Sequence, residues 1–322
     1  MHTILGSGGA IGVETARSLA ERGLPVRLVS RNPTPVTGAE ELHPADLGDP
    51  ATVEETVRTA IRGSEVVYVT VGFPYRAAVW ERSWPPLIEA TIAACRGEGA
   101  RLVFFDNVYL YHPSAVGDLT EESRIAPMSR KGRVRERVWR LIEAEAAKDG
   151  VPITVARAPD FANGANSVLR ILVVERLAAG RRPQWLGRTD VEHSFIDVVD
   201  AGRATALLGT TPEAFGEVWH LPTDATPRSL DDWIDLVARE LQAQGARVAR
   251  DRRAATLSHG ALRLLGLFSG DLRELSEMFY QYDRPYHFNS SRFETRFAMH
   301  PTGGDEVVRR LVADAVGARA RS

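Results

Sequence analysis

The sequence predicts an α/β fold, a doubly wound parallel sheet followed by a smaller, mostly helical C-terminal lobe. Strand-like apolar runs alternate with amphipathic helical stretches through residues 1–157, which is the pattern of repeated strand–helix units on a parallel sheet. The first strand leads into closely spaced glycines at the start of a helix. Beyond about residue 158 the alternation weakens and apolar helical stretches follow.

The first twelve residues contain the most informative motif. An apolar run leads into Gly-x-x-Gly-x-x-Gly, and a helical pattern follows. In such a unit the first glycine allows a tight turn, the second admits a pyrophosphate and the third lets the helix pack closely, while the helix N-terminus offers free N–H groups. The motif predicts a Rossmann-type dinucleotide cradle made of Gly6, Ser7, Gly8, Gly9, Ala10, Ile11 and Gly12.

The end of the second strand indicates which dinucleotide binds. Residues 25–30 form the predicted strand, and Ser30-Arg31-Asn32 follows with no acidic residue. NAD-binding proteins usually place Asp or Glu here, whereas a guanidinium pairs with the 2′-phosphate of NADP. We therefore expect NADP(H), with Arg31 on its phosphate, although the glycine loop contains no second basic residue.

Further strand–helix units follow in order. After a loop through Asp46 and Leu47, the predicted helices are 51–61, 84–96 and 132–148, and the predicted strands are 65–71, 101–105 and 152–156. Ligands of a parallel sheet bind where its strands end. The strand ends here are Thr70, Val71, Gly72 and Phe73, then Asp106 and Asn107, then Ala158, Pro159, Asp160 and Phe161.

The second half is organised differently. Strand-like residues 195–198 and 217–221 are expected to return to the sheet, and an amphipathic helix over 229–242 has Ser229 as its cap. Residues 255–282 are apolar and helical, and form either the core of a small lobe or a lid over an apolar substrate. We predict an NADP-binding domain over 1–157 and about 191–222, and a substrate lobe over about 158–190 and 223–322, ending in a helix over 305–320.

Composition narrows the class of protein. The 322 residues are 44% hydrophobic and 25% charged, as in ordinary globular proteins. A net charge of −2 gives no global field for nucleic acid or an anionic membrane. The single Cys95 cannot form an internal disulfide, which fits the cytoplasm. We expect no signal peptide, no membrane span and no metal, since the eight histidines lack ligand spacing.

With these segments placed, nearly the whole chain resembles the extended short-chain dehydrogenases/reductases, the NAD-dependent epimerase/dehydratase family. The similar parts are the glycine triplet, Asp46-Leu47, which resembles the acidic loop beside adenine, Gly72, and Phe-Ile-Asp-Val-Val-Asp-Ala at residues 195–201, which resembles the family's Phe-x-x-Val-x-Asp-x-Ala marker. The resemblance implies cofactor contacts at the strand ends and on the helix after residue 130, a small-molecule substrate, and a homodimer paired through helices.

The catalytic residues of that family are replaced. Its members use Ser or Thr with Tyr-x-x-x-Lys, but Asn107, Lys131 and Arg135 occupy the corresponding positions, which implies an atypical member. Asn107 can donate a hydrogen bond to a developing oxyanion. Arg135 can contact the cofactor ribose, and Lys131 is either a proton donor or, as we favour, a fixed cation. Then substrate or water supplies the proton, unless Tyr109 or Tyr111 does.

A simpler interpretation of this helix is also open. Arg130, Lys131, Arg133, Arg135 and Arg137 could form a solvated basic face, because long basic side chains mostly stay exposed.

Three functions are consistent with the sequence. The first is an NADPH-dependent ketoreductase acting on a carbonyl of a small aromatic or polycyclic secondary metabolite, because a loop with Phe73, Tyr75, Trp80 and Trp84 lies beside the predicted site. His193 is a further expected substrate contact. The second is an NADP(H)-binding sensor or scaffold without turnover. The weakest is a nucleotide-sugar epimerase or dehydratase, which normally relies on the missing tyrosine.

Overall fold

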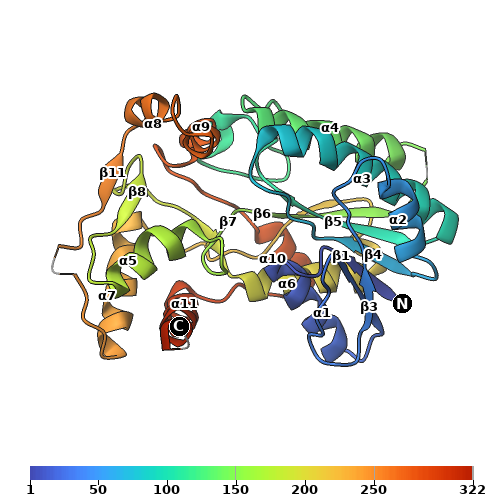
Figure 1. Cartoon of the computed structure of the whole chain (residues 1–322), viewed down its shortest axis with the longest axis horizontal. Helices are drawn as coiled ribbons and strands as arrows, with labels where there is room; N and C mark the ends of the chain where they lie inside the picture. The colour runs from blue at the N-terminus through green and yellow to red at the C-terminus, as the bar shows by residue number, and fades with distance from the viewer. Residues whose placement is uncertain (149, 250, 321–322) are drawn as a thin grey trace. The chain divides into compact units, whose positions relative to one another are not determined.

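A seven-stranded, all-parallel sheet forms the centre of the first of two units into which the chain divides. The computed structural model describes residues 1–148, 150–249 and 251–320 (Figure 1). The first unit contains Met1–Tyr111, Ile125–Ala158 and Val199–Leu221. The second contains His112–Arg124, Pro159–Val198 and the chain from Pro222 onward.

The strand order of the sheet is that of a doubly wound fold, β10-β6-β5-β4-β1-β2-β3. Its strands are β1 (His2–Leu5), β2 (Val26–Ser30), β3 (Glu41–Pro44), β4 (Val66–Val69), β5 (Arg101–Asn107), β6 (Ile153–Ala158) and β10 (Val218–His220). The order reverses between β1 and β4, and a doubly wound sheet binds its ligand at such a reversal. The predicted fold class is confirmed.

Helices cover both faces of this sheet. They are α1 (Ala10–Glu21), α2 (Val53–Ala60), α3 (Ala77–Glu98), α4 (Arg130–Ala146) and α6 (Val198–Thr210), with a 3-10 turn at Pro212–Ala214. Figure 1 shows α2, α3 and α4 on one face and α1 and α6 on the other. Gly202 allows α6 to approach α1 closely, because a Cβ at this residue would overlap Glu14. The central strands β1 and β4 are therefore buried on both faces, as the continuous apolar run at 66–69 predicts.

Two expectations about this unit are wrong. The edge strand β3 was expected to be part of a loop. Its residues are mostly exposed, and Arg27 of β2 pairs with Glu41 at 2.8 Å. An exposed edge strand has no apolar pattern to reveal it. Helix α3 begins at Ala77, not at Trp84, and both prolines after Trp84 lie inside it. The adjacent prolines looked like a helix start, because proline favours the first turn.

The second unit is mostly helical, with two small parallel sheets, β7 (Asp160–Phe161) with β9 (Phe195–Ile196) and β8 (Gln184–Leu186) with β11 (Ala255–Leu257). Its helices are α5 (Glu175–Ala178), α7 (Leu230–Ala243), α8 (His259–Leu265), α9 (Gly270–Ser276), α10 (Ser291–Phe297) and α11 (Gly304–Ala320). A π-helical segment covers Arg170–Val174, and 3-10 turns cover Pro113–Ala115 and Phe279–Gln281. Ser229 caps α7 as predicted, through a reciprocal capping box with Asp232.

Two further expectations are corrected here. Residues 195–196 do not return to the main sheet but pair with β7, whereas the strand within 217–221 does join it as β10. Residues 255–282 are not one helical stretch, and the turn between α8 and α9 exposes Leu267 and, at 87%, Phe268. This turn is therefore not part of the lobe's core.

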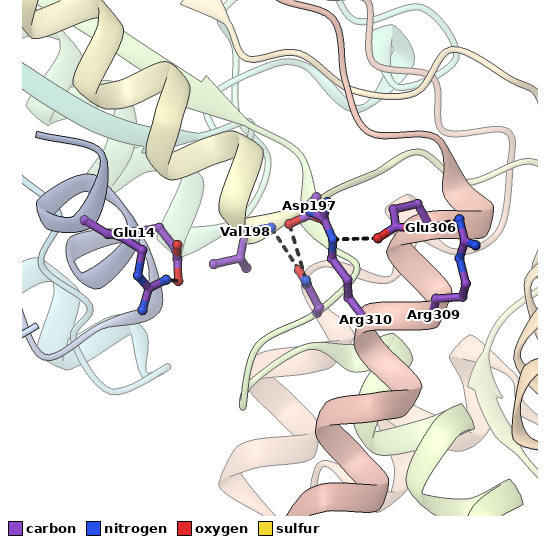
Figure 2. Close-up of polar contacts among 8 residues, drawn as sticks. Glu14, Asp197, Val198, Glu306, Arg309 and Arg310 are labelled. Carbon is purple, nitrogen blue, oxygen red and sulfur yellow. Dashed lines mark hydrogen bonds and ion pairs between the residues drawn. The ribbon is translucent and has the colours of Figure 1, made fainter. Parts of the chain in front are cut away.

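Asp197 fixes the segment after β9 within the second unit (Figure 2). Its buried carboxylate accepts a hydrogen bond from Arg310 of α11 at 3.1 Å and another from the Asn163 amide at 3.4 Å. Arg310 also donates to Glu306 at 3.1 Å. Asp197, one of two acidic residues in the segment 195–201, thus has a structural task, which is to hold α11.

The start of α4 packs too tightly for any side chain at Gly132. A Cβ there would lie 2.6 Å from Pro127 and overlap the carbonyl oxygen of Tyr109. Gly132→Ala is expected to destabilise the protein by about 1–3 kcal/mol, the usual cost of overpacking. The matched control is Gly97→Ala in α3, where no atom lies within 4 Å. Urea denaturation that shows equal stability changes for both variants would contradict this packing account.

Candidate functional site

The glycine cradle joins β1 to α1, and two of its glycines are required by the protein itself. Gly6 has a φ of +97°, and a Cβ on it would lie 2.6 Å from the backbone of Val71. A Cβ on Gly12 would lie 2.7 Å from the carbonyl oxygen of Gly6. At Gly9 the nearest atom would be 3.6 Å away, an ordinary contact. No protein atom therefore requires glycine at Gly9, which leaves its open side for a ligand.

Polar groups in the cradle have no partner among the described residues. Helix α1 begins after Gly9 with no side-chain cap and no acid in its first turn. The hydroxyls of Ser7 and of Ser30, the last residue of β2, are shielded from solvent but form no hydrogen bond with any described atom. Buried hydroxyls normally have partners. Together with the uncapped helix end, they fit the phosphates and sugar hydroxyls of a dinucleotide.

The other residues predicted to bind the cofactor follow the ends of β2 and β4 or open α1. Arg31 follows β2, is exposed and forms no ion pair within the described chain. Asp46 accepts a hydrogen bond from Gly48 N at 2.9 Å, and Leu47 is buried. Thr70 ties the end of β4 to β1 through its hydroxyl, 3.2 Å from the Leu5 carbonyl oxygen. Val71 and Gly72 follow it, and Ala10 and Ile11 open α1.

Beyond the cradle, the first unit contains a cluster of packed rings, which we call the aromatic cluster: Phe73, Tyr75, Trp80, Trp84, Phe104 and Tyr109. Trp80 stacks on Tyr109 with centroids 6.0 Å apart and an interplanar angle of 14°. Trp80 and Trp84 are not on a loop; they lie on α3, where they are buried. Only Phe73, Tyr75 and Tyr109 are partly exposed.

Two cations of α4 pack on this cluster. Lys131 is 0% exposed, and its Nζ lies 4.4 Å from the centre of the Tyr75 ring. One helical turn later, the Arg135 guanidinium carbon lies 3.9 Å from the centre of the Trp84 ring and 4.9 Å from that of Trp80. Cation–π contacts of this kind are strongest when desolvated. The interpretation of this helix as a solvated basic face is therefore wrong for Lys131 and Arg135.

The same interpretation does describe the other three basic residues of the helix. Arg130, Arg133 and Arg137 are exposed, and Arg130 pairs with Glu81 of α3 at 3.1 Å. The difference follows from helical periodicity, because Lys131 and Arg135 share one face and the other three project elsewhere.

Asp106 of β5 is the carboxylate that both buried arginines share. Arg157 of β6 donates to its Oδ2 at 3.2 Å, and Arg135 Nε lies 3.5 Å from its Oδ1. Burial lowers the pKa of Arg135, and the carboxylate of Asp106 opposes this effect. Arg135 therefore lies in the core against Trp84 and Asp106, and its Nε and Nη1 atoms form no hydrogen bond with any described residue.

Tyr111 belongs to the same buried network. Its hydroxyl accepts a hydrogen bond from Arg157 at 2.6 Å and lies 2.9 Å from His220 Nε2. Sequence reasoning did not identify Asp106, Arg157 or His220 as a network. The sequence contained one signal of it, because Asp106 and Arg157 each interrupt an apolar strand. The two residues are direct neighbours in the sheet.

Asn107 and Tyr109 lie together at the end of β5. Asn107 Oδ1 accepts a hydrogen bond from the Tyr109 backbone N–H at 3.0 Å, so the side-chain oxygen is used locally. Ala158, the last residue of β6, is the neighbour of Asn107 in the sheet. The Tyr75 hydroxyl donates to the Tyr109 hydroxyl at 3.3 Å. The structure thus brings Asn107, Tyr109 and Lys131 to one end of the sheet in the first unit.

The remaining predicted site residues, Pro159, Asp160, Phe161 and His193, belong to the second unit. His193 Nε2 lies 3.1 Å from Asp160 Oδ2, and the buried imidazole stacks between the rings of Tyr282 and Tyr286, with centroids 5.6 Å and 4.5 Å away. The Tyr282 hydroxyl donates to the same Asp160 oxygen at 3.4 Å. Neither tyrosine could be paired with His193 from sequence, because they are distant along the chain.

Other classes of site have less support. Among residues 1–148, 150–249 and 251–320, no group of three or more His, Cys, Asp or Glu side chains is arranged to hold a metal ion. Within the same ranges, no helix is long and apolar enough to cross a membrane.

Comparison with known proteins identifies the fold. No family model and no curated protein sequence matches the chain. Solved structures do match, including UDP-glucose 4-epimerase from Thermus thermophilus in complex with NAD, at 18% identity and a TM-score of 0.73 over 99% of this chain and 100% of that one. UDP-glucose 4-epimerase from Thermotoga maritima with UDP-glucose matches at 14% identity and 0.72, over 99% and 100%.

A third similar structure, UDP-glucuronic acid 4-epimerase from Bacillus cereus in complex with NAD, matches at 13% identity and a TM-score of 0.72, over 98% of this chain and 99% of that one. The chain therefore has the fold of these epimerases along nearly its whole length. The resemblance in fold to the epimerase/dehydratase enzymes is confirmed. At this identity the likeness concerns the fold alone.

Removing the shared carboxylate tests the buried network. Asp106→Ala is expected to destabilise the protein by about 3–5 kcal/mol, because it leaves buried guanidinium groups without their counter-ion. The control is Glu81→Ala, which removes the exposed partner of Arg130 and should change stability by about 1 kcal/mol or less. Denaturant titration followed by circular dichroism measures both, and a cost for Asp106→Ala no larger than the control's would contradict the account.

Proposed function

We propose that the chain binds NADP(H) and reduces a carbonyl group of a small aromatic or polycyclic metabolite. The observation that supports this most strongly is the cradle, where Gly9 is open and the Ser7 and Ser30 hydroxyls have no partner among the described residues. When bound there, a reduced nicotinamide supplies hydride.

The choice of NADP over NAD rests on the end of β2. The similar epimerase structures from Thermus thermophilus and Bacillus cereus contain NAD, which supports a nicotinamide dinucleotide. In this chain the first residue after β2 is Arg31, and the stretch Ser30-Arg31-Asn32 contains no acid to repel a phosphate. A guanidinium favours the doubly charged 2′-phosphate that distinguishes NADP.

The residues at the end of β5 and the start of α4 would act on the substrate oxygen. Asn107 uses its side-chain oxygen locally, so its amide N–H groups are the ones available to a developing oxyanion. Lys131 acts as a fixed cation near that oxygen and gives up no proton. Arg135 is left out of the proposed cofactor contacts, because its guanidinium lies against Asp106 and the faces of Trp84 and Trp80.

The proposal of an aromatic substrate is supported by fewer exposed aromatic residues than the sequence predicts. Trp80 and Trp84 are buried, and their rings are occupied by Arg135. Phe73, Tyr75 and Tyr109 remain partly exposed and form the proposed aromatic surface. His193 and Asp160 are proposed as a separate polar contact from the second unit.

A nucleotide-sugar epimerase or dehydratase is the second candidate, favoured by the fold shared with UDP-sugar epimerases. The third, an NADP(H)-binding sensor, is favoured by the replacement of both Tyr and Lys by Lys131 and Arg135. One set of assays separates them. The reductase consumes NADPH with aryl ketones or quinones, the epimerase retains NAD on purification and converts UDP-glucose, and the sensor binds NADPH without consuming it.

The role of Arg31 can be measured directly. Arg31→Ala is expected to weaken NADPH binding by about 1.5–3 kcal/mol, the value of a charge-assisted contact, and to leave NADH binding almost unchanged. Isothermal titration calorimetry with both nucleotides measures the difference. Arg58→Ala on the exposed face of α2 is the matched control and should change neither affinity. Equal losses for both nucleotides would show that Arg31 has a structural role only.

Lys131 can be tested by removing its charge. Lys131→Met is expected to slow NADPH-dependent turnover by about 10- to 100-fold, the scale of one lost electrostatic contact, while retaining any alkaline inflection of the pH–rate profile. Steady-state kinetics across pH measure both properties. If the variant loses an inflection that the wild type has, Lys131 donates the proton and the fixed-cation role is wrong.

A further inference from the structure

We propose that Tyr109 donates the proton in the reduction and that Tyr75 passes a proton from solvent back to Tyr109. The inference rests on the proposed function and identifies the proton donor that the replaced family tyrosine would otherwise supply. The geometry that supports it is the pair of phenols, whose oxygens are 3.3 Å apart with Tyr75 as the donor.

Tyr109 is held firmly at the end of the sheet where a ligand of this fold binds. Its backbone N–H donates to Asn107 at 3.0 Å, and its ring stacks on Trp80. Its carbonyl oxygen packs against Gly132 at the start of α4. A phenol fixed on three sides in this way can present its hydroxyl in one orientation, which proton transfer requires.

Tyr75 connects this position with solvent. The Tyr75 side chain is exposed, at 36%, whereas the Tyr109 side chain is half-buried. The ammonium of Lys131 lies over its ring at 4.4 Å. A positive charge over the face of a phenol favours its anionic form, so Lys131 stabilises Tyr75 at the moment when Tyr75 has given its proton to Tyr109. Lys131 therefore assists the transfer without losing its own proton.

Tyr111, the other tyrosine close in sequence, is unsuitable as the donor. Its side chain is buried, and Arg157 and His220 engage its hydroxyl. Arg157 and His220 are themselves buried, so neither connects the Tyr111 hydroxyl directly with solvent. The structure thus separates two tyrosines that the sequence left as equal alternatives.

The proposed step balances. As the carbonyl carbon gains a hydride from the reduced nicotinamide, the C=O π electrons move to oxygen, which takes the Tyr109 proton. The Tyr109 oxygen then takes the proton of Tyr75, and Tyr75 takes one from water. The net change is one carbonyl, one NADPH and one proton converted to one alcohol and one NADP⁺.

The coupling between the phenols is tested without cofactor or substrate. The full chain is labelled with carbon-13 at tyrosine Cζ, and each of its seven tyrosine signals is assigned by a Tyr→Phe variant. The pH titration of the Tyr109 signal is expected to change in Tyr75→Phe and to stay the same in the control Tyr280→Phe, which alters the second unit. An identical Tyr109 titration in wild type and Tyr75→Phe would overturn the relay.

The donor role is tested with NADPH and acetophenone, which has no phenol of its own. Tyr109→Phe is expected to lower kcat by about 10²- to 10⁴-fold, the usual contribution of a general acid, and to abolish the alkaline inflection that Lys131→Met retains. Tyr75→Phe should lower kcat less, and Tyr280→Phe not at all. Unchanged kcat in Tyr109→Phe overturns the donor role alone, whereas a wild type that neither binds nor consumes NADPH overturns the proposed function as well.

Discussion

One carboxylate shared by two buried guanidinium groups determines much of the first unit. Asp106 lies between Arg157 of the neighbouring strand and Arg135 of α4, and all three side chains are almost fully shielded from water. One negative charge cannot neutralise two positive charges, so the faces of Trp84 and Trp80 provide the remaining stabilisation. This arrangement explains why a charged helix packs closely against an apolar sheet.

The way in which α4 is held determines the arrangement of the candidate site. Because Arg135 is held in the core, Lys131 one turn earlier is fixed over Tyr75, and the start of the helix is fixed against Tyr109. Lys131 and Arg135 are therefore both buried, the first over the Tyr75 ring and the second against Trp84 and Asp106. The cradle does not depend on these contacts, because Gly6, Gly12 and their backbone contacts set its shape.

Sequence reasoning predicted the parallel sheet and the cradle because both depend on local patterns, apolar strands and spaced glycines. It missed β3, because Glu41 and its neighbours are exposed, and it placed the start of α3 too late, because prolines after Trp84 resembled a first turn. The family resemblance also suggested Arg135 as a cofactor-binding group. Only the three-dimensional arrangement shows that its partners are a strand carboxylate and two indole rings, since such contacts join residues that are far apart in sequence.

The most direct test of the account is a crystal structure of the full chain with NADP⁺. The account predicts the pyrophosphate at Gly8 and Gly9 with the Ser7 hydroxyl as a hydrogen-bond partner, the 2′-phosphate on Arg31, and Arg135 still on Asp106 and Trp84. An empty cradle in crystals grown with saturating NADP⁺, or a pyrophosphate bound elsewhere on the chain, would contradict it.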